Sequence, residues 1–186
     1  MPAIIEWPAV IKKGSINHVP SNTVDIYPTV LELAGVRLPG NQSVLDGVSL
    51  ADLIKGELFH RDKPIGFWDF PEKGRSRRAR AMLEALRAEQ KAGEQKPAPK
   101  EGLIDKKYPL HEFPGPSAWI AGDWKLHRIP AKNGKQVNYQ LFNLAKDMAE
   151  KKDLVAVQPE RLTRMKTELA AWQKSVLNSL NGNDYR

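Results

Sequence analysis

The residues best suited to chemistry in this chain are its four histidines, His18, His60, His111 and His127. No two of them follow the His-x-x-x-His or His-x-His spacing that places two imidazoles on one metal ion. The sequence has no cysteine, which excludes disulfides and thiolate metal sites. It also has no glycine-rich phosphate loop, no nucleophile elbow and no carboxylate pair with a convincing partner. The residues by themselves therefore predict no complete catalytic centre.

Positive charge is concentrated in one segment of the chain. The net charge is +7, and residues 73–107 hold 11 basic and 5 acidic side chains, so this segment carries +6 of it. Its densest part could bind nucleic-acid phosphates, attract a sulfated polyanion, or form a solvated face. No aromatic side chain is interleaved there for base stacking, so we expect no nucleic-acid partner. The basic side chains concerned are Arg75, Arg77, Arg78 and Arg80.

The first third of the chain predicts elements of a large sheet. Residues 3–11 are apolar and β-branched with almost no polar face, which is typical of a parallel strand covered by helices on both sides. A helix is expected over residues 25–35, with the Asp25 carboxylate capping its first turn and Gly35 ending it. Asp25 could instead be a metal ligand. The predicted buried face of this helix is Val30, Leu31, Leu33 and Ala34.

The middle of the chain predicts short elements and an insertion. Ser49 should cap a short helix that ends at Gly56, and residues 65–70 read as a strand between two prolines. Residues 77–91 favour a helix, and the proline-containing stretch 96–100 favours an extended linker. We interpret residues 72–107 as a surface insertion.

The last third predicts an antiparallel meander covered by a helix. Turns at Gly122-Asp123 and Asn133-Gly134 should join three strands. A long helix should begin at Pro159 and bury one face on the sheet, where each large apolar side chain contributes about 1.5–3 kcal/mol. Its apolar stripe is Leu162, Met165, Leu169, Trp172, Val176 and Leu180.

Several of these segments, taken in order, resemble the sulfatase family, in particular the arylsulfatases and N-acetylgalactosamine-6-sulfatases. The resemblance implies an α/β fold: the C-terminal part of an alkaline-phosphatase-like sulfatase domain, plus a small antiparallel sheet packed by a C-terminal helix. It divides the chain into residues 1–71, the end of the large domain, 72–107, the basic insertion, and 108–186, the C-terminal subdomain. The matching motifs are Trp7-Pro8, Asp25-x-x-Pro28-Thr29, Leu33-Ala34-Gly35, Leu45-Asp46-Gly47-Val48-Ser49-Leu50, Gly122-Asp123-Trp124-Lys125-Leu126 and Leu141-Phe142-Asn143-Leu144-x-x-Asp147-x-x-Glu150.

The resemblance implies a chemistry whose central groups this sequence lacks. Sulfatases hydrolyse sulfate esters with a formylglycine made in a Cys/Ser-x-Pro-x-Arg motif, beside a calcium ion held by carboxylates and an amide. Neither that motif nor the paired metal ligands occur here. The family pattern puts formylglycine, calcium and the catalytic lysine in an N-terminal half that would precede Met1. We therefore expect no activity from this chain alone, no cofactor bound by it, and that missing half as its partner.

The resemblance also implies a substrate class and a location. The substrate would be a sulfated small molecule or polysaccharide, with His111, Trp68 and Lys125 at the substrate rim. The alternatives are an ordinary loop histidine for His111 and a core aromatic for Trp68, and Lys125 could contact an anion. Sulfatases of this kind are exported, so we expect a periplasmic or extracellular protein, although residues 1–20 contain no signal peptide. No apolar run is long enough to span a membrane.

Two other interpretations remain open from the sequence. The chain could be a non-catalytic module in which the basic insertion binds an anionic polysaccharide. It could also derive from a truncated reading frame that gives no stable product.

Overall fold

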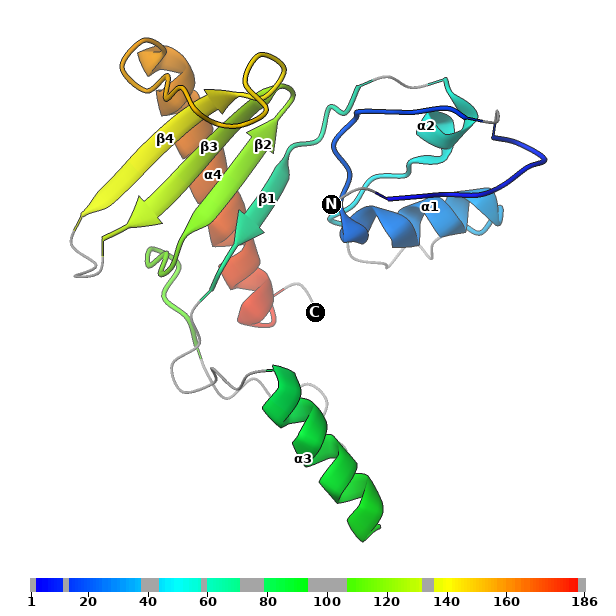
Figure 1. The fold of residues 1–186 in the computed structure, drawn as a ribbon. Coiled ribbons are helices and arrows are strands. Elements are labelled where there is room, and N and C mark those ends of the chain that lie inside the picture. Colours follow the sequence, from blue (N-terminus) through cyan, green and yellow to red (C-terminus); the bar gives the residue numbers. More distant parts are fainter. Residues whose placement is uncertain are drawn as a thin grey trace.

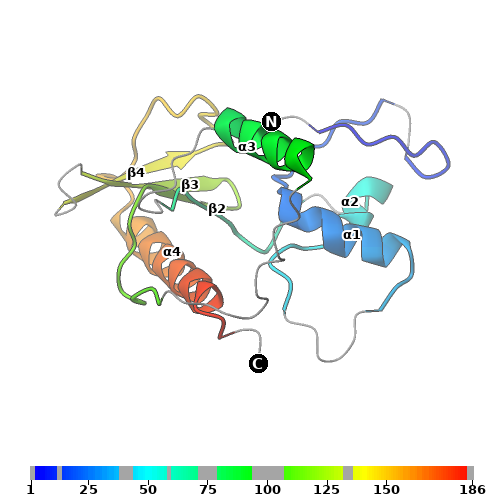
Figure 2. The ribbon, with the colours of Figure 1, turned by 90° about the horizontal axis from the view of Figure 1, so that it is seen from below.

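The computed structural model describes residues 3–11, 14–37, 44–57, 60–70, 79–93, 107–131 and 136–183. A four-stranded sheet is covered on one face by a long helix. The described residues before β1, which include η1, α1 and α2, form a small unit beside the β1 edge of this sheet, here called the N-terminal unit (Figures 1 and 2). The elements in chain order are η1 (Thr23–Asp25), α1 (Ile26–Leu33), α2 (Ala51–Lys55), β1 (Ile65–Trp68), α3 (Ala79–Ala92), β2 (Ser117–Ala121), β3 (Trp124–Pro130), β4 (Val137–Asn143) and α4 (Pro159–Leu180). In the described part of the chain, no helix is both long and apolar enough to cross a membrane.

The sheet is an antiparallel meander in the order β1-β2-β3-β4. The predicted turn between β2 and β3 is confirmed, and Gly122 occupies it with φ +55°. The predicted strand after the second turn is confirmed as β4, which pairs with β3 from Trp124↔Asn143 to Pro130↔Val137. The second turn itself, at Asn133-Gly134, lies outside the described residues. Local turn chemistry therefore predicted this half of the fold well.

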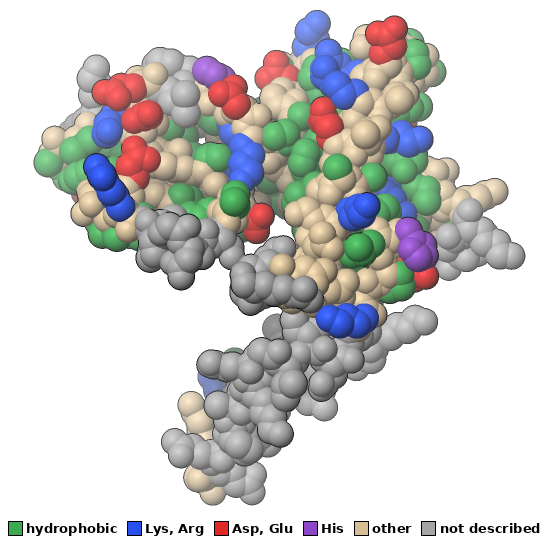
Figure 3. Space-filling view, turned by 180° about the vertical axis from the view of Figure 1, so that it is seen from behind, with side chains coloured by type: hydrophobic (Ala, Val, Ile, Leu, Met, Phe, Trp, Pro, Cys, Tyr) green, Lys and Arg blue, Asp and Glu red, His purple; other side chains and the backbone are tan. Residues whose placement is uncertain are grey.

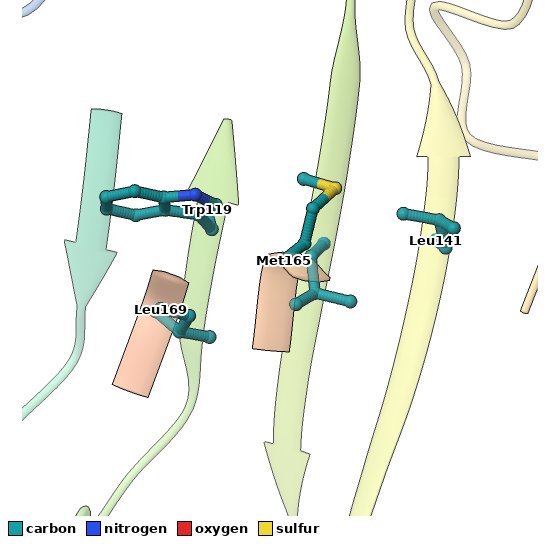
Figure 4. Close-up of a cluster of buried hydrophobic side chains, with 5 residues drawn as sticks. Trp119, Leu141, Met165 and Leu169 are labelled. Atoms are coloured by element: carbon teal, nitrogen blue, oxygen red, sulfur yellow. The ribbon is translucent and has the colours of Figure 1, made fainter. Parts of the chain in front are cut away.

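The core lies between the sheet and α4. Trp119 of β2 and Leu141 of β4 lie on the same side of the sheet as Met165 and Leu169 of the helix (Figure 4), and Leu126 of β3 belongs to the same buried cluster. Pro159 begins α4 as predicted. The predicted apolar stripe is only partly correct, because Leu180 is 40% exposed whereas Gln173 and Leu177 are each 1% exposed. The fully buried positions recur every four residues, and this spacing exceeds 3.6, so the buried line slants around a helix that crosses the strands obliquely.

Strand β1 confirms the predicted strand but not its expected place. It is shorter than residues 65–70 and pairs antiparallel with β2, from Ile65↔Ile120 to Trp68↔Ser117. The family resemblance assigns residues 1–71 to the end of the large domain, whereas β1 joins the same sheet as the C-terminal strands. The register explains why β1 fits here: Gly66 lies opposite Trp119, on the face covered by α4, and a Cβ at Gly66 would overlap the ring of Trp172. The absent side chain lets the indole lie directly on the strand.

The apolar segment at the start of the chain is not a strand. Residues 3–7 are extended coil, a turn follows at residues 8–10, and Ile4 and Ile5 are 95% and 54% exposed. The prediction of a buried strand over residues 3–11 is therefore wrong for this structure. No strand among the described residues pairs with this segment, and a strand needs a neighbour to satisfy its backbone groups. Its hydrophobic pattern alone did not determine its conformation.

Helix α1 forms as predicted, but its apolar side is open. Gly35 ends the helix with φ +67°. Val30 is 57% exposed, Leu33 is 36% exposed and Ala34 is also exposed, so the predicted buried face is wrong. The side that packs inward instead carries the buried Thr29. We call the exposed apolar residues of this helix and its C-terminal flank the α1 apolar face: Ile26, Tyr27, Val30, Leu33 and Val36.

The two remaining helices agree with the sequence. The Ser49 hydroxyl accepts a hydrogen bond from the Ala51 N–H (3.1 Å) at the start of α2, and Gly56 ends that helix with φ +81°. Helix α3 spans Ala79–Ala92, close to the predicted 77–91. The predicted linker at residues 96–100 lies outside the described residues.

Candidate functional site

The most strongly connected polar group in the described residues is the carboxylate of Asp25, at the start of α1. The side chain of Asp25 is fully buried, and that of Arg61 is 7% exposed. Arg61 donates to both carboxylate oxygens, from Nη1 (2.8 Å) and Nη2 (3.0 Å). The backbone N–H groups of Asn22 (2.7 Å) and Val48 (2.9 Å) donate to the same carboxylate. Asp25 therefore joins η1, the loop before α2 and the segment before β1.

This network corrects the predicted role of Asp25. Its carboxylate does not cap α1, which has no side-chain cap; it accepts instead from Asn22, three residues before it, and from distant segments. It is not a metal ligand in this structure, because its oxygens are occupied by Arg61 and backbone donors. Burial alone would raise the pKa of Asp25, but the hydrogen bonds from Arg61, Val48 and Asn22 lower it below its ordinary value. The carboxylate is therefore held ionised as part of the framework.

The two motifs around this carboxylate owe their residue types to packing. The Thr29 hydroxyl donates to the Asp25 carbonyl and accepts from the Leu50 N–H (2.9 Å), so it ties α1 to the loop before α2. A Cβ at Gly47 would overlap the backbone carbonyl of Val24. The residues of the Asp25-x-x-Pro28-Thr29 and Asp46-Gly47 motifs thus join α1 to the loop before α2 through hydrogen bonds and close packing, which is a structural role.

A pocket of about 430 Å³ lies between the N-terminal unit and the edge of the sheet. Its volume is within the range of small-molecule sites, about 300–1,000 Å³. One wall is apolar and includes Ile65 of β1 and Ile120 of β2, which are directly paired. The opposite wall comes from residues 16–20 and 60–63. The polar lining residues are Asn17, His18, His60, Arg61, Lys63 and Asp123.

A second polar cluster lies on the face of the sheet opposite α4. Glu150 accepts from Lys125 Nζ (2.6 Å) and contacts His127 Nε2 (2.8 Å) through its other oxygen. Burial raises the pKa of Glu150, and the hydrogen bonds from Lys125 and His127 outweigh this, so the pKa lies below its ordinary value. Glu150 has a left-handed backbone, φ +55°. The cluster fixes the loop after β4 onto the sheet.

The structure does not gather the predicted rim residues into one site. Trp68 pairs with Ser117 on the α4 face, donates from Nε1 to the Pro114 carbonyl (2.6 Å) and packs against Trp172. Lys125 pairs with Ile120 on the opposite face and is bound to Glu150. His111 is exposed in the loop before β2. Trp68 and Lys125 are therefore separated by the sheet.

The predicted anion-attracting arginines are mostly outside the part of the chain that the structure describes. This applies to Arg75, Arg77 and Arg78, whereas Arg80 belongs to the first turn of α3. Two residues that sequence reasoning missed are Arg61 and Glu150. Arg61 had one indirect signal, since a carboxylate that starts a buried helix requires a cation nearby.

No calcium site is formed by the residues that the structure describes. Among them, no three carboxylate, histidine or cysteine side chains lie close enough together to hold a metal ion. The two carboxylates with the strongest contacts, Asp25 and Glu150, are already neutralised by cationic side chains. The described residues therefore do not fit the metal that the family resemblance implies.

Sequence comparisons find sulfatase relatives, and structure comparisons find proteins of similar fold. No family model matches the sequence. A sulfatase of Formosa agariphila is 26% identical over 180 residues, which is 92% of this chain and 26% of the relative. The steryl-sulfatase of Homo sapiens is 40% identical over 67 residues, which is 36% of this chain and 11% of the relative. A protein solved in complex with its substrate, D-glucosamine-2-N,6-O-disulfate, has a similar fold, with 18% identity and a TM-score of 0.53. The superposition covers 97% of this chain and 28% of the chain of that protein.

These findings define the class first by fold: a small antiparallel sheet with a C-terminal helix, as at the end of an alkaline-phosphatase-like sulfatase domain. The chain resembles the C-terminal portion of sulfatases, and the family resemblance found in the sequence is confirmed. It spans about a quarter of the length of the Formosa agariphila relative.

Proposed function

We propose that this chain acts as the C-terminal part of a sulfatase and supplies its scaffold, while the reactive groups come from a preceding catalytic part. The observation that carries the proposal is the match over 92% of this chain to only 26% of a sulfatase. The residues that the structure describes supply no metal cluster, and the sequence supplies no cysteine. We therefore expect formylglycine and calcium to belong to the catalytic part.

The α1 apolar face supports the proposal that this chain packs against a separate catalytic part. Ile26, Val30 and Val36 are each more than half exposed on one short helix and its C-terminal flank. Apolar patches of this kind on a soluble protein mark interaction surfaces. Hydrophobic side chains also reach the surface of the N-terminal unit when the molecule is viewed from behind (Figure 3). We propose that the catalytic part covers the α1 apolar face.

The substrate and location follow from this proposal. The substrate class would be a sulfated saccharide, since one structural neighbour was solved with a disulfated glucosamine. The calcium ion of the complete enzyme would polarise the sulfate group. The residues of this chain would supply the rim and the support beneath it. Because the sheet separates Trp68 from Lys125, only one of these two rim candidates can lie at the same rim as His111. The protein would act in the periplasm or outside the cell.

A chimaera tests the proposal. The C-terminal quarter of the Formosa agariphila sulfatase is removed, and this 186-residue chain is joined in its place. We expect the truncated enzyme and the isolated chain to show no turnover of an aryl sulfate, and the chimaera to recover sulfatase activity. Turnover by the isolated chain, or an inactive chimaera that is folded and carries formylglycine, would contradict the proposal.

Matched variants test the α1 apolar face. Val30→Asp with Leu33→Asp should abolish the activity of the chimaera without lowering the stability of the isolated chain, because both side chains are exposed in it. Val157→Asp is the control, since Val157 is 65% exposed on the loop before α4. If both sets of variants retain activity, the α1 apolar face is not the contact with the catalytic part.

A second candidate function is a non-catalytic module that binds an anionic polysaccharide. The charge of +6 over residues 73–107 favours it. Replacing Arg75, Arg77, Arg78 and Arg80 by Ser should remove retention on a heparin column at physiological salt, because this retention depends on clustered cations. Unchanged retention would exclude the basic segment as the binding site.

A further inference from the structure

The pocket between the N-terminal unit and the β1–β2 edge has a lining that no role described so far explains. Its apolar wall is formed by Ile65 and Ile120, and its polar wall carries imidazole, ammonium and amide groups. Saccharide sites need both kinds of wall, since a sugar ring has apolar C–H faces and a rim of hydroxyl groups. The question is therefore which polar groups of the pocket are available to a ligand.

Arg61 is not available. Its Nη1 and Nη2 atoms donate to Asp25, and its Nε donates to the Lys63 carbonyl (2.7 Å). It forms part of the wall, and its charge is balanced by Asp25.

Three cationic or donor groups retain hydrogen-bonding capacity. Lys63 Nζ donates to the Leu45 carbonyl (2.8 Å), which leaves two of the three ammonium protons. Among the residues that the structure describes, the ion-pair partner of His60 is the exposed Asp62 (3.3 Å), and this pair is open to solvent, with side chains 71% and 92% exposed. His18 is exposed and has no hydrogen-bond partner among the residues that the structure describes. These groups can therefore turn toward a bound anion.

One acidic side chain of the lining favours a sulfated sugar over a free sulfate ion as the ligand. Asp123 comes from the turn between β2 and β3 and lines the same pocket as Lys63 and the two histidines. A carboxylate repels free sulfate but accepts hydrogen bonds from sugar hydroxyls. The lining thus combines donors for a sulfate group, an acceptor for a hydroxyl and an apolar wall.

We propose that this pocket binds one sulfated sugar unit, with the sulfate group against His18, His60 and Lys63 and a ring hydroxyl on Asp123. The inference rests on the proposed sulfatase function, since it takes the sulfated saccharide as ligand. It assigns a binding site for one unit of a sulfated saccharide to residues of this chain.

Binding to the isolated 186-residue chain tests the site without any turnover. The probes are D-glucosamine-2-N,6-O-disulfate, unsulfated glucosamine and inorganic sulfate, titrated while the backbone amides are followed by NMR. We expect saturable shifts at residues 16–20 and 60–65 with the disulfate only. His18→Ala with His60→Ala should weaken this binding about tenfold or more, because each charge-assisted hydrogen bond that is lost corresponds to roughly that factor.

Two control variants separate this pocket from general charge attraction. Lys151→Ala with Lys152→Ala removes two exposed cations outside the pocket. Replacing the four arginines of residues 75–80 by Ser removes the basic cluster. Both should bind the disulfate as the parent chain does. Binding that survives in the histidine variant, or that disappears with the arginines alone, overturns the proposal.

The remaining outcomes are also decisive. If inorganic sulfate competes as well as the disulfate, the sugar contacts are wrong and the site is an anion site only. If no probe binds saturably while the chimaera is active, the pocket is not a saccharide site although the proposed function stands. If the probe binds and the chimaera is inactive, the pocket proposal survives and the proposed function fails.

Discussion

Asp25 and Arg61, 36 residues apart in the sequence, form a buried bidentate ion pair with N–O distances of 2.8 and 3.0 Å. The carboxylate also accepts from two backbone N–H groups, so each of its oxygens has more than one donor. The interior of the N-terminal unit is therefore held together at this point by a buried ion pair whose hydrogen bonds are satisfied, and not by apolar side chains. Replacing one partner leaves the other as an isolated buried ion, which is far costlier than losing an exposed pair.

The first prediction concerns this ion pair. Asp25→Ala should lower the free energy of unfolding of the N-terminal unit by about 3–5 kcal/mol, because the Arg61 guanidinium remains buried without a counter-charge. Asp62→Ala is the matched control, because Asp62 is 92% exposed, and it should have no measurable effect. Amide hydrogen exchange at Val48, whose N–H donates to Asp25, reports the loss directly. Equal protection in both variants would show that the pair does not stabilise the unit.

The second prediction concerns pH. The pKa values of Asp25 and Glu150 are both lowered in the folded chain. Their stabilising contribution is complete above the carboxyl pKa of an unfolded chain, about 4, and is lost as the pH falls through the lower folded values. The urea midpoint should therefore fall on acidification below about pH 4. In Asp25→Asn with Glu150→Gln the midpoint should start lower at pH 7 and change less; an unchanged pH profile would contradict the assignment.

The third prediction concerns the contact between β1 and α4. A Cβ at Gly66 would overlap the Trp172 ring, so Gly66→Ala should displace the indole and destabilise the sheet by about 1–3 kcal/mol. In the background of Trp172→Leu, the added methyl group has room, and its cost should largely disappear. Urea unfolding of the four proteins measures this coupling as a double-mutant cycle. Additive effects would mean that the ring does not pack on β1.

The fourth prediction compares two leucines of α4. Leu169→Ala should cost about 2–5 kcal/mol, because the side chain is 1% exposed within the core cluster. Leu180→Ala should cost much less, because Leu180 is 40% exposed although it continues the sequence stripe. Thermal unfolding of the two variants measures the difference. Equal losses of stability would agree with the periodic sequence pattern, which predicts that both leucines are buried, and would contradict the structure.

The sequence predicted the elements that short-range signals determine. The turn at Gly122-Asp123 and the strands on either side follow from turn chemistry and alternation, and α4 follows from Pro159 and its apolar spacing. The family motifs were also read correctly as a C-terminal sulfatase portion. Turn residues, helix starts and apolar spacing are read from neighbouring positions of one chain, so a single sequence contains these signals completely.

The features that failed depend on distant partners. The apolar segment 3–11 satisfies the pattern of a buried strand but lacks a neighbour among the described residues, and β1 pairs with a strand 49 positions later. The positions of two rim candidates also depend on strand pairing, because alternation along β1 and β3 places Trp68 and Lys125 on opposite faces of the sheet. The pairing of a strand determines which face of the sheet each of its side chains occupies. Local sequence patterns do not identify the strand with which it pairs.

The pairing of β1 with β2 has a consequence for how freely this protein can vary. The residues between Trp68 and Ser117 join two strands that the sheet holds side by side. The last of these residues are bonded to the fold, since the Pro114 carbonyl accepts from Trp68 and the Tyr108 N–H donates to Asn181. The entropy of closing such a connection grows only with the logarithm of its length, so doubling it costs about 0.6 kcal/mol. Additions or deletions between Phe70 and Lys107 should therefore cost the sheet little stability, and selection can change the length of this part without disturbing the strands at either side.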